Sequence, residues 1–256
     1  MKIVATIRQL PDLIEPLIID ASGSSLDYGE ARFLVNEYDD HALEQAVLLK
    51  EQHGASVTVV ALDFGDVNDA LYTAAAKGVD RIVKIPYEQE KPPSPRTAAE
   101  LFAGVIRDLQ PDLILAGVQS YEEWDGSFTP LLAHTLQLPY VGLIQGVECS
   151  SEQSIMAFKE FPGAAKARMN IRLPAVLGIL AASHPPRYVP ISRVRTAMKT
   201  AHFEEIEAAL LSFAPKIQLE KLYTPITGAR AEMIDGSESE IANRIVQLLT
   251  EKGVLK

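Results

Sequence analysis

The sequence has 256 residues, of which 47% are hydrophobic, and a formal net charge of −10. A chain of this length and composition can bury one substantial core, alone or with an appendage. The negative charge argues against a nucleic-acid polymer or an anionic membrane as the main partner, but it leaves room for a single nucleotide bound by backbone amides. One cysteine excludes an internal disulfide framework, and no apolar run could span a bilayer, so we expect a soluble protein of the cytoplasm, without membrane insertion.

The first half of the chain alternates between strand and helix patterns. Short apolar strands are expected over 2–7, 56–62, 81–85 and 112–116, and helices from 36 to about 53, over 66–77 and over 97–109. Gly54 and Gly78 follow two of these helices, as C-terminal glycines commonly do. Residues 13–35 are expected to form an irregular excursion with a hairpin. The alternation predicts βαβ units on a parallel sheet with helices on both faces.

A polar loop follows the apolar strand 112–116 and leads into a helical pattern over 131–136. Asp125, Ser127 and Thr129 are candidate caps for that helix. A loop between the carboxyl end of a strand and the amino end of a helix is where doubly wound proteins hold phosphates and nucleotides. The pattern is equally compatible with an ordinary, well-capped strand-to-helix connection, and the local sequence does not decide between the two.

The second half of the chain has a different pattern. Strand-like stretches are expected over 140–149, 153–161, 166–172 and 174–180, with a turn at Pro162-Gly163. They predict an antiparallel extension of the sheet. A helix is expected around 202–213, and a final helix over 238–252 after the cap Ser237. The tail has too few apolar residues for a core of its own, so we expect it to pack on the main domain or on a partner chain.

No catalytic or metal-binding constellation is recognisable. The five histidines are scattered, without zinc-like spacing to Cys or carboxylates, and no P-loop, Gly-x-Ser-x-Gly elbow or dinucleotide glycine fingerprint is present. The acidic pairs Asp39-Asp40 and Glu122-Glu123 are most simply partners of helix dipoles. The sequence therefore indicates no acid–base or nucleophilic machinery, no catalytic residue and no metal site.

Several separated stretches share one set of landmarks. They are 1–12, 36–51, 74–81, 117–130, Leu173-Pro174-Ala175-Val176 and Pro186-Arg187-Tyr188. In this order they resemble the small, beta subunit of electron-transfer flavoproteins. The tail, with Leu222-Tyr223-Thr224-Pro225 and 248–254, is similar to the anaerobe and nitrogen-fixation branch of that family, which includes electron-bifurcating members.

The resemblance implies a doubly wound α/β fold of the adenine nucleotide α-hydrolase type, with a nucleotide-binding domain over 1–200 and a C-terminal arm over 201–256. The arm would pack on a larger alpha subunit that carries the redox-active FAD. The beta subunit would hold AMP or, in bifurcating members, a second FAD. The heterodimer would pass electrons between a dehydrogenase, for acyl-CoA or another substrate, or NADH, and an acceptor.

The resemblance also implies positions for the site. The cofactor-binding residues would be Thr6, Asn36, Tyr38, Leu62, Asp63, Gly117, Gly126, Ser127, Phe128 and Thr129. Contacts through Thr6, Leu62 and Gly117 would be mainly through backbone, and residues 126–129 would surround the phosphate. Residues 184–199 would form the partner-recognition loop, with Arg187, Tyr188 and Ile191 as partner-binding residues.

Two positions depart from the family pattern. Gly126-Ser127-Phe128 stands where the AMP-binding loop usually has Asn-Gln-Thr, and Asp63-Phe64 stands where Gly-Pro is usual. A carboxylate beside a phosphate is unfavourable unless it points away. These departures leave open a family member that has lost its nucleotide and serves as a scaffold. A separate alternative, from a different class, is a stand-alone adenine-nucleotide-binding domain of the universal-stress-protein type.

Overall fold

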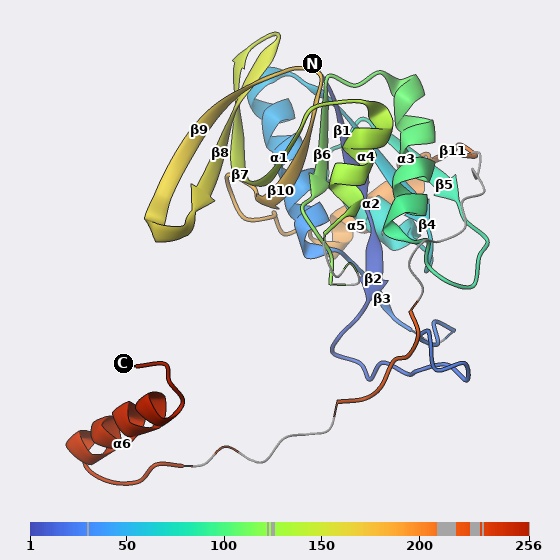
Figure 1. Ribbon diagram of the computed structural model, residues 1–256. Helices are drawn as coiled ribbons and strands as arrows, with labels where there is room; N and C mark the ends of the chain where they lie inside the picture. The colour runs from blue at the N-terminus through green and yellow to red at the C-terminus, as the bar shows by residue number, and fades with distance from the viewer. Residues whose placement is uncertain are drawn as a thin grey trace. The chain divides into compact units, whose positions relative to one another are not determined.

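The computed structural model describes residues 1–29, 31–121, 123, 126–208, 219–225, 231 and 233–255 (Figure 1). The chain divides into two compact units, Met1–Lys221 and Leu222–Lys256. The second unit contains one helix, α6 (Glu238–Glu251), within its described residues. The helix begins with the expected capping box, in which Glu240 accepts hydrogen bonds from the backbone N–H and the hydroxyl of Ser237.

A mostly parallel sheet forms the centre of the first unit. Its described strands lie in the order β11-β5-β4-β1-β6-β10-β7-β8-β9. Their bounds are β1 Lys2–Ile7, β4 Ser56–Asp63, β5 Arg81–Pro86, β6 Leu113–Gly117, β7 Tyr140–Ser151, β8 Ser154–Phe161, β9 Ala165–Arg172, β10 Ala175–Ala181 and β11 Glu204–Glu205. Pairing is parallel from β11 to β7 and antiparallel between β7, β8 and β9. The predicted doubly wound fold with an antiparallel extension is confirmed.

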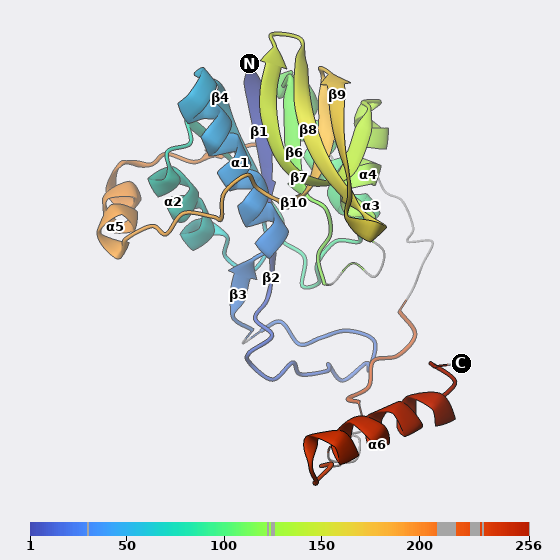
Figure 2. The same cartoon turned by 90° about the vertical axis from the view of Figure 1, so that its left-hand side faces the viewer.

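Helices cover both faces of this sheet (Figure 2). Their bounds are α1 Glu37–His53, α2 Asn68–Lys77, α3 Pro95–Leu109, α4 Phe128–Leu136 and α5 Ile191–Thr200. Helices α1 and α2 pack on one face, with α5 against α2, and α3 and α4 pack together on the other. Gly54 and Gly78 end α1 and α2 with φ of 67° and 102°, the left-handed conformation that glycine adopts without a steric penalty.

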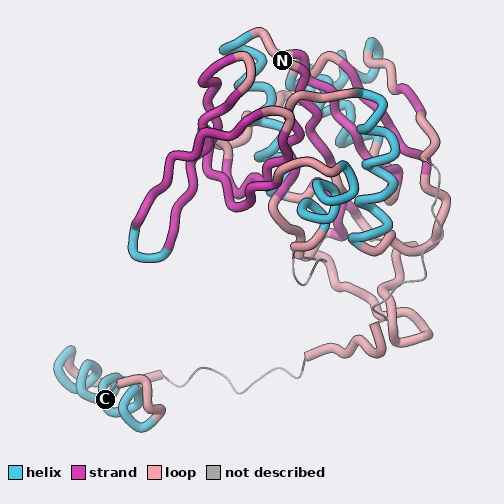
Figure 3. The backbone as a smooth tube through the Cα atoms, turned by 45° about the horizontal axis from the view of Figure 1, so that its top comes forward, coloured by secondary structure: helices cyan, strands magenta, loops and turns pink. Residues whose placement is uncertain are grey.

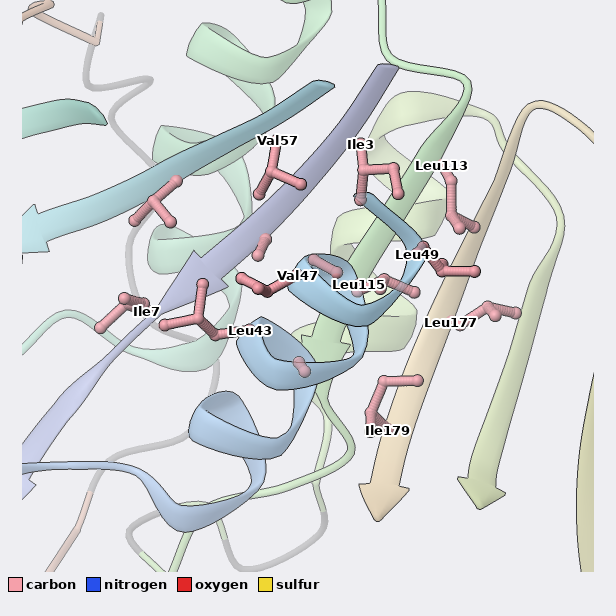
Figure 4. Packing of buried hydrophobic residues seen from close by; sticks show 14 of the residues in the cluster. Ile3, Ile7, Leu43, Val47, Leu49, Val57, Leu113, Leu115, Leu177 and Ile179 are labelled. Carbon is pink, nitrogen blue, oxygen red and sulfur yellow. The ribbon is translucent and has the colours of Figure 1, made fainter. Parts of the chain in front are cut away.

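The core beneath α1 is purely aliphatic. Leu43 and Val47 of α1 belong to one buried cluster with Ile3 of β1, Leu115 of β6 and Leu177 of β10 (Figure 4). Each of these side chains is at most 2% exposed. Burying one such side chain stabilises the fold by about 1.5–3 kcal/mol. This packing fixes the amino end of α1 over the carboxyl ends of the central strands.

The excursion after β1 begins and ends in a small second sheet. Strand β2 (Gln9–Pro11) pairs antiparallel with β3 (Phe33–Val35), which leads directly into α1. At one edge of the main sheet, β8 and β9 form a long hairpin that protrudes from the body (Figure 3). Its turn is the expected Pro162-Gly163, with Gly163 at φ 79°.

Three elements differ from the sequence predictions. Residues 174–180, expected in the antiparallel extension, form the interior parallel strand β10 between β6 and β7. Residues 191–200, expected as loop, form α5. The helix predicted around 202–213 is wrong over its described part, because Glu204–Glu205 pair with β5 as a strand. Residues 209–213 of that prediction lie outside the described residues.

Candidate functional site

The point where the strand order reverses lies at the carboxyl ends of β1 and β6. From β1 the chain proceeds to β4 and β5 on one side of the sheet, and from β6 it proceeds to strands on the other side. Open α/β sheets bind ligands in the crevice at such a point. The predicted residues at the ends of β1, β4 and β6 and at the start of α4 therefore lie together at the carboxyl ends of the strands. This end of the sheet is called the switch-point edge below.

A buried ion pair holds this edge together. Arg8 follows β1, and its Nε donates to Asp39 Oδ2 of α1 at 2.9 Å. The same carboxylate accepts from the backbone N–H groups of Arg8, at 3.1 Å, and of Gly117, at 2.7 Å. Asp39 is completely buried, so its charge is stabilised by Arg8 and by fixed amides rather than by water.

Gly117 is required by the close approach of α1 to the end of β6. A Cβ at this position would lie 2.6 Å from Asp39 Oδ1 and 2.8 Å from the backbone carbon of Tyr38. The backbone at Gly117 is therefore accessible to Asp39 only because the residue has no side chain. Tyr38 itself is half-buried at the start of α1.

Glu123 of the loop lies against the amino end of α4. Its Oε2 accepts from the backbone N–H of Phe128 at 3.1 Å, and its Oε1 forms an ion pair with Arg8. The side chain of Glu123 is 8% exposed. Burial and then the charge of Glu123 raise the pKa of Tyr140, the first residue of β7. Glu122, Trp124 and Asp125 lie outside the described residues.

The predicted phosphate-contacting residues have distinct roles at the start of α4. Gly126 has φ 61° and turns the chain, and Ser127 is the residue before the helix, without a side-chain cap. Phe128 is fully buried against Phe102, with ring centroids 5.2 Å apart, so only its backbone faces the loop. Thr129 Oγ1 donates to the carbonyl oxygen of Gly117 at 2.7 Å and binds α4 to β6.

Thr6 and Asn36 lie at the other end of the predicted site. Both are buried. Asn36 Nδ2 donates to the carbonyl oxygen of Gln119 at 3.0 Å, which ties the start of α1 to the loop. Thr6 Oγ1 has no hydrogen-bond partner among the described residues. A buried hydroxyl without a partner is costly, so a polar ligand atom at Thr6 would satisfy it.

Leu62 and Asp63 end β4 beside this edge, and Leu62 is buried. Asp63 Oδ2 lies 3.0 Å from Lys84 Nζ, which also lies 2.9 Å from Glu205 Oε1. Glu205 first, and then Asp63, raise the pKa of Lys84. The charge of Asp63 is thus compensated within the chain, which reduces the repulsion that a nearby phosphate would meet.

An aromatic groove adjoins Asp63, and the sequence analysis did not identify it. Tyr28 and Phe33 from the excursion pack edge-on against Phe64, each with ring centroids 5.4 Å apart, and Phe64 also contacts Tyr87. The four rings line a groove together with the acidic and basic side chains of the loop after β5. Their long separation in the sequence concealed this cluster.

Arg187 forms ion pairs with residues of its own chain. Its Nε lies 2.8 Å from Glu44 Oε1, and its terminal nitrogens bind both carboxylate oxygens of Glu51, so two glutamates of α1 hold it. Its backbone N–H also donates to Glu44, at 3.0 Å. Arg187 therefore attaches the segment before α5 to α1.

Tyr188 and Ile191 differ from Arg187 in exposure. The Tyr188 side chain is 83% exposed and that of Ile191 is 66% exposed. Large apolar side chains presented by an anchored segment are typical of an interaction surface. The structure thus separates the three predicted partner-binding residues into one anchor and two exposed side chains.

Sequence reasoning did not identify the ion-pair chain from Asp39 through Arg8 to Glu123. The acidic pairs containing Asp39 and Glu123 were interpreted as helix-dipole partners, and Arg8 only as part of the landmark stretch 1–12. The available signal was Arg8 itself, a cation directly after a buried strand. A charge in such a place needs an opposite charge nearby.

The described residues contain neither a membrane-spanning helix nor a metal-binding cluster. None of their helices is long and apolar enough to cross a membrane. Within the same residues, no group of three or more His, Cys, Asp or Glu side chains is placed to hold a metal ion.

Comparison with known proteins identifies the family. The family model described as electron transfer flavoprotein domain matches residues 27–211. The electron transfer flavoprotein subunit beta of Methylophilus methylotrophus is 28% identical over 98% of this chain and 98% of its own length. Protein FixA of Azorhizobium caulinodans is 26% identical over 96% of this chain and 92% of its own.

A third relative extends the comparison to a reductase complex. The caffeyl-CoA reductase-Etf complex subunit CarD of Acetobacterium woodii is 25% identical over the full length of both chains. The matches cover the switch-point edge, the antiparallel extension and the tail alike. With its fold, its switch-point site and this full-length similarity, the chain belongs to the electron transfer flavoprotein family and is similar to its beta subunits.

Proposed function

We propose that this chain is the beta subunit of an electron-transferring heterodimer, paired with an alpha subunit that carries FAD. The observation that carries the proposal is the similarity to named beta subunits over nearly the whole chain. In this role the chain transfers electrons as part of the complex and performs no substrate chemistry of its own. Electrons would pass between a dehydrogenase, or NADH, and an acceptor.

The nucleotide site of the proposed subunit is the switch-point edge. Thr6, Asn36, Leu62 and Gly117 would contact the nucleoside of AMP or of a second FAD, and residues 126–129 lie where its phosphates would be. The partnerless hydroxyl of Thr6 fits the nucleoside end. The phosphate end fits less well, because Glu123 holds the Phe128 N–H and Arg8. A nucleotide would serve as a structural group or, in the FAD case, supply a second flavin.

The proposed dehydrogenase-recognition surface is residues 184–199. Arg187 would position this segment through Glu44 and Glu51, while Tyr188 and Ile191 contact the partner. Because Arg187 is engaged internally, we assign it a positioning role rather than a direct contact.

The proposed docking arm lies within 201–256. Ile245 and Val246 of α6 are 44% and 53% exposed, and Val254 after the helix is 67% exposed. Helix α6 buries no residue of its own. An amphipathic helix in this state gains stability when a partner covers its apolar face, and the alpha subunit would be that partner.

Co-expression with an alpha subunit from the same genome tests the proposal. The purified complex is denatured, and the released nucleotides are counted per heterodimer. One FAD and one AMP would indicate a plain electron carrier, whereas two FAD and no AMP would indicate the bifurcating type. If no stable heterodimer forms and the chain binds ATP or AMP alone, the proposal fails in favour of a stand-alone nucleotide-binding domain.

A further inference from the structure

The proposed phosphate end of the site already contains an anion of the chain itself. Glu123 Oε2 accepts the backbone N–H of Phe128, the first residue of α4, at 3.1 Å. Its Oε1 pairs with Arg8. A helix amino end and a guanidinium both bind phosphate oxygens well. Here a carboxylate occupies both, with only 8% of its side chain exposed.

Arg8 is held in place and cannot follow a ligand without breaking other contacts. Its guanidinium bonds to Asp39 and lies 4.3 Å from the centre of the Phe128 ring. A phosphate beside Arg8 would therefore add negative charge to a site that already contains Asp39 and Glu123. Like charges at such distances repel strongly in a buried environment. Glu123 must leave before a phosphate can take its position.

The nucleoside end of the site contains a polar group that the chain leaves without a hydrogen bond among its described residues. Thr6 Oγ1 is buried and finds no partner among the residues that the structure describes. Side chains alternate along a strand, so Thr6 shares a face of β1 with Val4, which packs in the same cluster as Leu62 and Phe128. The site therefore has two unlike halves. The hydroxyl of Thr6 at one end has no partner among the described residues, whereas the amino end of α4 at the other end already binds Glu123.

We propose that Glu123 is a specificity-determining residue whose carboxylate competes with the ligand's phosphate for Arg8 and the amino end of α4. The inference rests on the proposed function, since it concerns the nucleotide site of that subunit. In the native chain the phosphate adds little to affinity, so adenosine and AMP bind about equally. Removing the charge of Glu123 frees the anion-binding groups, and AMP then binds better than adenosine.

Calorimetric titration of the full-length, nucleotide-free chain tests this with adenosine and AMP as ligands. The variants are E123Q and E123A, with E152Q as control, because Glu152 is an exposed acid in the turn between β7 and β8. We expect the ratio of AMP to adenosine affinity to rise at least tenfold in both Glu123 variants and to stay unchanged in E152Q. Equal ratios in native and variant chains would overturn the proposal. Trp124, the only tryptophan, directly follows Glu123 in the sequence and provides a fluorescence readout of the same titrations.

Inorganic phosphate provides an arm that needs no nucleoside. At constant ionic strength, phosphate should raise the melting temperature of E123Q and E123A by more than that of the native chain and E152Q. If no chain binds adenosine or AMP, the nucleotide part of the proposed function fails, while this phosphate difference still supports the role of Glu123. If no chain binds adenosine or AMP and phosphate also acts on all four chains alike, the role of Glu123 is refuted. Using two substitutions ensures that a folding defect in one of them does not remove the test.

Discussion

The carboxylate of Asp39 lies 2.9 Å from Nε of Arg8 and connects the ends of three elements. It accepts from the backbone after β1 and from Gly117 at the end of β6, while it belongs to α1. A buried charge in this position is stabilising only as long as every partner is present. The pair therefore sets the geometry of the edge on which the proposed nucleotide site depends.

Replacing Asp39 by asparagine should destabilise the chain by about 3–5 kcal/mol, because a buried pair is broken and two backbone donors lose a charged acceptor. Urea unfolding measures the loss as a lower midpoint at constant slope. Glu37→Gln is the control, since Glu37 is exposed in the first turn of the same helix, and it should change stability by less than about 0.5 kcal/mol. A D39N chain as stable as the native one would contradict this account of the ion pair.

Two glycine-to-alanine substitutions should have opposite signs. At Gly117 the new Cβ would lie 2.6 Å from Asp39 Oδ1 and 2.7 Å from the Asp39 backbone nitrogen, so G117A should cost more than about 2 kcal/mol. At the exposed Gly104 in α3 the nearest atom would be 3.8 Å away, and G104A should stabilise by about 0.5–1 kcal/mol. Thermal and urea unfolding of both variants provide the measurement. A stabilised G117A chain would show that α1 does not approach β6 as closely as described.

The link between Arg187 and Glu51 should make a small pH-dependent contribution to stability. The hydrogen bonds from Arg187 hold the pKa of Glu51 below its ordinary 4.5. A carboxyl group with a lowered folded-state pKa stabilises the protein above its unfolded-state pKa, and this stabilisation is lost as the pH falls through the folded-state value. Because Glu51 is half exposed, the effect should stay below about 1 kcal/mol.

The stability difference between the native chain and E51Q should accordingly be present at neutral pH and decrease below about pH 4.5. Urea midpoints at several pH values measure it. Glu152→Gln serves as the comparison, because Glu152 is exposed in the β7–β8 turn and forms no ion pair with the residues that the structure describes. A difference that grows on acidification would mean that the sign is wrong.

Substitution of the exposed side chains before and in α5 should affect electron transfer without affecting folding. Tyr188 and Ile191 are 83% and 66% exposed, so Y188A and I191A should leave the melting temperature within a few degrees of native. If they are the anchors of the partner interface, each should slow electron transfer from the dehydrogenase by roughly tenfold or more. Stopped-flow flavin reduction of the heterodimer gives the rate. Phe161→Ala, at the tip of the β8–β9 hairpin, is the matched control because its ring is 46% exposed outside this segment. Equal rates for all three variants would place the interface elsewhere.

Local patterns predicted β1 and β4 to β10, the first three helices and the final helix, because apolar periodicity and terminal glycines carry that information within a few residues. The position of β10 could not be predicted this way. An apolar run of this kind fits both an edge strand and a strand between β6 and β7. Only the pairing of β10 with β6, about sixty residues earlier in the chain, distinguishes these two positions. Helix α5 was missed because the resemblance suggested a recognition loop over the same residues.

The strand-loop-helix pattern predicted at 112–136 is confirmed, and it places the loop at the carboxyl end of β6, but it carried no information on the contacts made there. It could not indicate that Phe128 turns into the core against Phe102 of α3, or that Glu123 reaches Arg8 from more than a hundred residues away, because both depend on side-chain packing between separate elements. Arg187 was expected at the partner interface from the resemblance, and its ion pairs with two glutamates of α1 could not be predicted from the local sequence.

Strand β10 also has a consequence for synthesis of the protein. Its residues Ala175 to Ile179 pair with Leu113 to Gly117 of β6, the strand that ends at the candidate site. A nascent chain on the ribosome therefore completes β6 long before the neighbouring strand emerges. During that interval the apolar edge of β6 has no partner on one side, which is the condition that recruits chaperones or leads to aggregation. Expression of this protein should thus depend on how quickly translation passes residue 181 and on which chaperones attend it.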